Sequence, residues 1–153
     1  MSNEEIKQKI EQICEELGIE IVWFKTGKSC ANRQKKSVRV KEIGDSGDFA
    51  VALHEIGHTQ CDPQNKPANP GEVLDAETNA WTWALERNGG NFDAEGWKRL
   101  HESLLEYYHC VMDTSHPALQ LLMEAVRQND AIRPQGSSFA VKINFGRKKK
   151  TTL

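Results

Sequence analysis

The sequence has no apolar run long enough to cross a bilayer, and its charges nearly cancel. A membrane-spanning helix needs roughly 20 consecutive apolar residues, and no such stretch is present. The formal net charge of −2 over 153 residues gives no overall attraction for nucleic acid or for an anionic membrane. Residues 1–5 are polar and acidic, unlike the start of a secretory signal. We therefore expect a cytoplasmic protein that binds neither nucleic acid nor a membrane directly.

Paired cysteines, internal repeats and a domain boundary are also absent from the sequence. The four cysteines are scattered without a CxxC pair, and in a reducing compartment such residues are expected to remain free thiols. A length of 153 residues suits one domain with a substantial core. We expect a single domain over residues 1–146 and a solvated basic tail over residues 147–153. No helix-turn-helix pattern is recognisable, and nothing in the sequence indicates the oligomeric state.

Hydrophobic periodicity predicts a mixture of helices and strands. Five segments show the spacing of amphipathic helices: residues 3–17, 48–60, 72–87, 93–108 and a segment that starts at residue 115. Three segments are typical of strands, because they are rich in β-branched and aromatic residues or alternate apolar with polar: residues 19–24, 37–43 and 139–145. The expected fold is α+β, mainly helical, with a short sheet of two or three strands.

Residues 54–58, His-Glu-Ile-Gly-His, form an HExxH motif inside one of the predicted helices. Residues four positions apart lie on one helical face, so His54 and His58 can offer imidazole nitrogens to the same zinc ion. Glu55 lies beside that face, where its carboxylate can act as general base on a water at the metal. The motif therefore predicts two ligands and the base of a zinc hydrolase.

The helix predicted over residues 72–87 offers the third ligand. Its apolar face is formed by four residues: Leu74, Trp81, Ala84 and Leu85. Glu77 lies in the middle of that face, and a carboxylate is costly to bury unless it is paired or bound to a metal. Glu77 is therefore the preferred third ligand. Cys61, three positions after His58, is an alternative, although the Asp-Pro pair that follows it favours the end of the helix there.

These motifs resemble those of the ImmA/IrrE family of metallopeptidases. That family combines an HExGH helix, here residues 54–58, with a second helix carrying an acidic-x-Glu-Ala-Asn-x-aromatic pattern, here residues 75–81. The resemblance covers residues 38–85. Two positions depart from the usual pattern, since Thr78 stands where the family usually has Ala and Trp81 where it often has Phe. Neither change alters a ligand.

The resemblance implies a zincin-like minimal metallopeptidase with zinc on His54, His58 and Glu77 and with Glu55 as catalytic base. It also implies a site similar to that of thermolysin. The better-known members relieve repression by cleaving a partner repressor. We therefore expect a Zn2+-dependent metallopeptidase that hydrolyses a peptide bond in an intracellular protein, with a transcriptional regulator as one candidate substrate.

Two other functions remain open at this point. The chain can be a zinc-binding regulatory or interaction module without proteolytic activity, in which case Glu55 is dispensable for the biological effect. It can also be a structural protein in which the HExxH sequence is accidental, in which case neither the metal nor its ligands matter. Zinc content separates the last hypothesis from the other two.

Further residues are candidates for roles in catalysis or substrate binding. Four side chains are candidates for a second donor to the oxyanion: His101, Tyr107, Tyr108 and His109. The strand over residues 37–43 is a candidate edge along which an extended substrate pairs, with Arg39 and Lys41 on one face. The proline-containing loop over residues 62–71 is a candidate flap over the site.

Overall fold

A computed structural model describes residues 1–62 and 65–132. These residues form five α-helices, a three-stranded sheet and a short 3-10 helix. In chain order the elements are α1 (Asn3–Leu17), β1 (Glu20–Phe24), β2 (Cys30–Asn32), β3 (Ser37–Lys41), α2 (Ser46–Cys61), α3 (Pro70–Arg87), α4 (Ala94–His109), α5 (Pro117–Gln128) and η1 (Asp130–Ile132). The mainly helical α+β fold predicted from the sequence is confirmed. The strand predicted over residues 139–145 and the basic tail lie outside the described residues.

Side-chain caps set where the helices begin. The Asp45 side chain accepts a hydrogen bond from the Asp48 amide, and the Asp48 side chain accepts one from the Asp45 amide, which forms a reciprocal capping box at the start of α2. The Asn69 side chain caps α3 by accepting a hydrogen bond from the Glu72 amide, ahead of Pro70 at the first position of the helix. Both α2 and α3 therefore begin two residues before the predicted start, because the capping residue fixes the boundary.

The three strands form one mixed sheet in the order β1-β3-β2. β3 pairs in parallel with β1, with Ile21 opposite Val38, and antiparallel with β2, with Cys30 opposite Arg39. The expectation that residues 37–43 form a free edge for a substrate is therefore wrong. β2, which lies between two of the strands that the sequence predicts, pairs with that edge and is itself the edge strand on this side.

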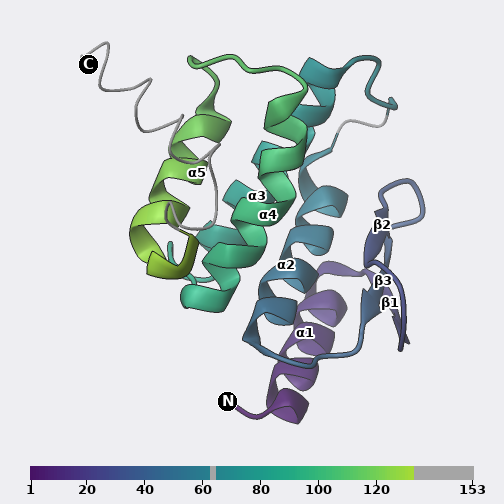
Figure 1. Ribbon diagram of the computed structural model, residues 1–153. Coiled ribbons are helices and arrows are strands. Elements are labelled where there is room, and N and C mark those ends of the chain that lie inside the picture. Colours follow the sequence, from purple (N-terminus) through teal and green to yellow (C-terminus); the bar gives the residue numbers. More distant parts are fainter. Residues whose placement is uncertain (63–64, 133–153) are drawn as a thin grey trace.

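Helix α2 is the centre of the molecule. It packs against α1, α3 and α4 and also against β2 and β3. In Figure 1 the strands lie on one side of α2, and α3, α4 and α5 lie on the other. Leu53 and Ile56 of α2 have no exposed surface. Among the described residues, no helix is both long enough and apolar enough to span a membrane.

The contact between α2 and α3 depends on a glycine. A Cβ atom placed on Gly57 would lie 2.7 Å from the carbonyl oxygen of Ala80 and 3.2 Å from its Cα atom. Both are backbone atoms, so a side chain at position 57 cannot be accommodated by rotating a neighbouring side chain. The close approach brings the HExxH helix and the helix that carries Glu77 into direct contact.

Candidate metal centre

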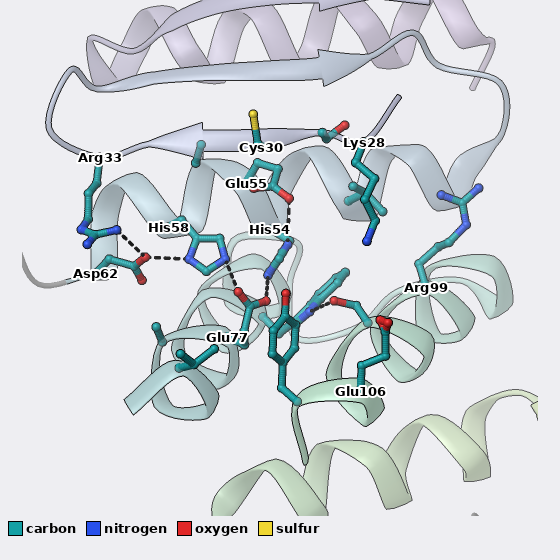
Figure 2. A pocket seen from close by; sticks show the side chains of 18 of the residues that line it. Lys28, Cys30, Arg33, His54, Glu55, His58, Asp62, Glu77, Arg99 and Glu106 are labelled. Atoms are coloured by element: carbon teal, nitrogen blue, oxygen red, sulfur yellow. Dashed lines mark hydrogen bonds and ion pairs between the residues drawn. The ribbon is translucent and has the colours of Figure 1, made fainter. Parts of the chain in front are cut away.

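Two imidazoles and one carboxylate converge between α2 and α3. His54 Nε2 lies 2.9 Å from Glu77 Oε1, and His58 Nε2 lies 3.1 Å from Glu77 Oε2. One ligand atom from each residue lies within 4.8 Å of the other two. Figure 2 shows the Glu77 carboxylate facing both rings. The structure thus brings the three predicted ligands together in an arrangement that can hold a metal ion.

The ring of His54 is held by the indole of Trp81. The two rings are stacked, with 4.3 Å between their centroids and 14° between their planes. Trp81 has no exposed surface, and its Nε1 donates a hydrogen bond of 3.4 Å to Ser103 Oγ on α4. The orientation of one candidate ligand is therefore fixed by a core residue that lies one turn after Glu77 on α3.

The three side chains form a network of charges. Burial lowers the pKa of His58, but its hydrogen bonds to Asp62 and Glu77 outweigh this effect and raise the pKa to about 10. Burial raises the pKa of Glu77, but the imidazoles of His54 and His58 outweigh it and lower the pKa to about 2. Burial also lowers the pKa of His54, yet Glu55 and Glu77 raise it overall. A metal ion that binds here must displace protons from the imidazoles.

Glu55 lies beside this cluster. Its side chain is 11% exposed, and its Oε2 lies 3.4 Å from His54 Nδ1, the ring nitrogen that does not face Glu77. Figure 2 shows Glu55 between the strand that carries Cys30 and the ring of His54. Because Glu55 lines the same cavity as the cluster without belonging to it, its carboxylate can exchange protons with a molecule bound there.

A cavity of about 550 Å³ opens over the cluster. Its walls come from the loop before β2, from β2 itself, and from α2, α3 and α4. Cys30 also lines it, but Figure 2 shows the sulfur of Cys30 pointing away from Glu55. All four cysteines of the chain are free, as expected. Cys61, the alternative ligand, does not belong to the cluster of His54, His58 and Glu77.

Helix α4 presents only one of the four candidate oxyanion donors to the cavity. Tyr107 lines it together with Ser103 and Glu106. The negative charge of Glu77 is the main cause of a raised pKa at Tyr107, which indicates that the phenol lies close to the cluster. His101, Tyr108 and His109 do not occur among the described residues that line the cavity.

For His101 and Tyr108 the reason lies in the periodicity of α4. His101 and Tyr108 are 4% and 2% exposed, respectively, because they lie on the apolar stripe that packs into the core. Burial lowers the pKa of His101, whose Nε2 is buried without a hydrogen-bond partner among the described residues. The cavity faces the neighbouring stripe of the helix, which the apolar pattern does not mark.

Asp62 is a member of the site that the sequence pattern did not single out. The loop over residues 62–71 contributes Asp62 and Pro67 to the walls of the cavity. Asp62 Oδ2 accepts a hydrogen bond from His58 Nδ1 at 2.8 Å. The available signal was an aspartate four positions after His58, at the end of the same helix, where it can reach the outer nitrogen of the ring.

Comparison of the chain with known protein families, with curated proteins and with solved structures finds no match, so the likeness to a family rests on the motifs at residues 54–58 and 75–81.

Proposed function

We propose that the protein is a zinc-dependent metallopeptidase with a zincin-like site of the ImmA/IrrE type. The observation that carries the proposal is the convergence of His54, His58 and Glu77 beneath a cavity that Glu55 also lines. If the HExxH sequence were accidental, there would be no reason for Glu77 to lie within 4.8 Å of both histidines, or for a cavity to open over the three side chains.

Zinc fits the donors of this cluster. Two imidazole nitrogens and one carboxylate oxygen are the three protein ligands of a common class of catalytic zinc sites, in which a further position stays open. The side chain of Glu77 is only 13% exposed, and a buried carboxylate on an apolar helix face needs such a partner. A bound zinc ion supplies Lewis acidity, which acidifies water and polarises a peptide carbonyl.

The residues around the cluster support peptide hydrolysis. Glu55 takes a proton from the attacking water and delivers it to the nitrogen of the leaving amine. The phenol of Tyr107 donates a hydrogen bond to the oxyanion that develops on the carbonyl oxygen. An extended substrate pairs with the outer edge of β2, whose residues Cys30 and Ala31 line the cavity. The expected substrate is a segment of an intracellular protein, with a transcriptional regulator as one candidate.

The first experiment measures zinc by elemental analysis in untagged protein after extensive dialysis. We expect close to one zinc per chain in the wild type and a sharp loss in Glu77→Ala. A folded wild-type protein that takes up no zinc, even after reconstitution, overturns the proposal.

The second experiment uses Glu55→Gln, which removes the base and keeps the ligands. We expect zinc content to be unchanged and hydrolysis to fall by roughly 10²–10⁴-fold. A biological effect that survives in Glu55→Gln favours the zinc-binding regulatory module without proteolytic activity over the peptidase.

A further inference from the structure

Asp62, at the C-terminal end of α2, is attached twice to His58. Its Oδ2 accepts a hydrogen bond from His58 Nδ1 at 2.8 Å, and its backbone N–H donates one to the carbonyl oxygen of His58 at 3.2 Å. The backbone of Asp62 is extended, with φ −72° and ψ 143°. A residue before proline prefers this conformation, and Pro63 follows in the sequence. The chain therefore leaves α2 in a direction that turns the carboxylate back towards the ring.

We propose that Asp62 is the positioning residue of the metal ligand His58, and that Arg33 of the β2–β3 hairpin holds Asp62 in place. This inference rests on the proposed metal site. A carboxylate that accepts a hydrogen bond from Nδ1–H fixes the ring orientation and leaves Nε2 as the nitrogen that faces the metal. His58 Nε2 is the nitrogen that faces Glu77.

Arg33 links the hairpin to this carboxylate. Its Nη1 lies 3.7 Å from Asp62 Oδ2, and its Nη2 donates a hydrogen bond of 3.2 Å to the carbonyl oxygen of Asn65. The side chain of Asp62 is 7% exposed, and a carboxylate this buried needs positive partners. In Figure 2 the dashed lines run without interruption from Arg33 through Asp62 and His58 to Glu77. The hairpin that forms one wall of the cavity is thus connected to the candidate metal centre.

The two imidazoles are held by different means. The ring of His54 is stacked on Trp81, and its Nδ1 faces Glu55 at 3.4 Å. His58 has its Nδ1 hydrogen bond to Asp62 instead. Removal of the Asp62 carboxylate therefore loosens one ligand and leaves the other two in place, which predicts weakened metal binding and not its abolition.

The test measures zinc affinity of the full chain by competition with a chromogenic chelator. We expect zinc to bind roughly 10- to 100-fold more weakly to Asp62→Ala. Asp62→Asn should lose less, because its amide oxygen still accepts a hydrogen bond from His58. The matched control is Asp75→Asn, which removes the same charge from a carboxylate that also binds a histidine, His116, at 2.7 Å. Asp75 is 63% exposed at its side chain and lies outside the cluster, so its variant should bind zinc within about twofold of wild type.

A second readout separates positioning from a general loss of structure. Cobalt in place of zinc should show altered d–d absorption in Asp62→Ala, because the bands report the geometry of the ligands, whereas the control should keep the wild-type spectrum. If Asp62→Ala does not fold, Arg33→Gln provides the test, because this variant retains both Asp62 and His58. It should weaken zinc binding by roughly two- to tenfold, less than the loss of Asp62 does.

The outcomes distinguish the positioning role from the proposed function. If the wild type binds zinc and both Asp62→Ala and Arg33→Gln bind it equally well, the positioning role is overturned and the metallopeptidase proposal stands. If the folded wild type binds no zinc, the metal centre itself is absent and both proposals fail.

Discussion

Gly57→Ala tests whether the approach of α2 to α3 sets the metal centre. The added methyl group meets three backbone atoms of Ala80, at 2.7, 3.2 and 3.3 Å. Ordinary carbon contacts are about 3.5–4.0 Å, so the helices must separate by roughly 0.5–1 Å. Overpacking of this kind costs about 1–3 kcal/mol, while replacing Gly by Ala inside a helix gains about 1 kcal/mol. We expect a net loss of about 0–2 kcal/mol in the free energy of unfolding, which lowers Tm by up to roughly 8 °C.

The same displacement should weaken zinc binding, because Glu77 lies one turn before Ala80 on α3. Urea denaturation of the metal-free protein measures the first effect, and chelator competition measures the second. Gly71→Ala is the control: a Cβ there meets only Asn69 Oδ1, a side-chain atom, at 3.3 Å, so the substitution should not separate α2 from α3 and should leave zinc affinity within about twofold of wild type. A Gly57→Ala protein that is more stable than wild type, as helix propensity alone predicts, refutes the reasoning.

Four further predictions concern the site and the residues that support it. The pKa of His58 is raised to about 10, and zinc must displace the proton from this ring, so zinc affinity should increase as pH rises from about 6.5 to 8.5. Chelator competition at several pH values measures this dependence, and a zinc affinity that does not change with pH contradicts it. The same shift stabilises the metal-free protein fully below the unfolded-state pKa of about 6.5, and this contribution should be lost as pH rises towards 10 in urea denaturation. Tyr107→Phe should lower kcat by roughly 10²-fold with unchanged zinc content, and an unchanged kcat removes the phenol from the mechanism. Burial raises the pKa of Asp48, but the Gly44 amide and Arg99 outweigh it and lower the pKa overall, so the stability that this carboxylate contributes is present above about pH 4 and lost below it. Asp48→Asn should therefore lower the free energy of unfolding by roughly 1.5–3 kcal/mol at pH 7 and by progressively less below pH 4. An equal loss at pH 7 and below pH 4 contradicts an ionised Asp48.

The parts of the fold that the sequence predicted well are those with complete local signals. In α1, Ser2 and Glu5 form a capping box at the start, and Gly18 ends the helix with φ +69°. The apolar spacing between them needs no information from elsewhere in the chain. The strand Cys30–Asn32 had no such signal, because three residues are too few to show alternation and its partner lies in β3.

The residues of the candidate site also fall into those that a local sequence signal predicts and those that it does not. His54 and His58 follow from spacing within one helix, and Glu77 follows from the cost of a carboxylate on an apolar face. The contact of Arg33 with the end of α2 is a tertiary contact that no local pattern encodes. His101 was selected because it lies on the apolar stripe of α4, and that stripe faces the core instead of the cavity.

The stacking of Trp81 on His54 gives the protein an optical reporter of the candidate metal centre. Indole fluorescence is quenched by a protonated imidazole in van der Waals contact, and Glu55 and Glu77 outweigh burial to raise the pKa of His54 and favour that protonated form. A metal ion bound to His54 would replace the proton and should change the emission of Trp81 without any added label. Occupancy of the candidate centre by a metal ion should therefore be measurable as a change in the tryptophan fluorescence of the folded chain, to which Trp81 contributes as one of four tryptophans.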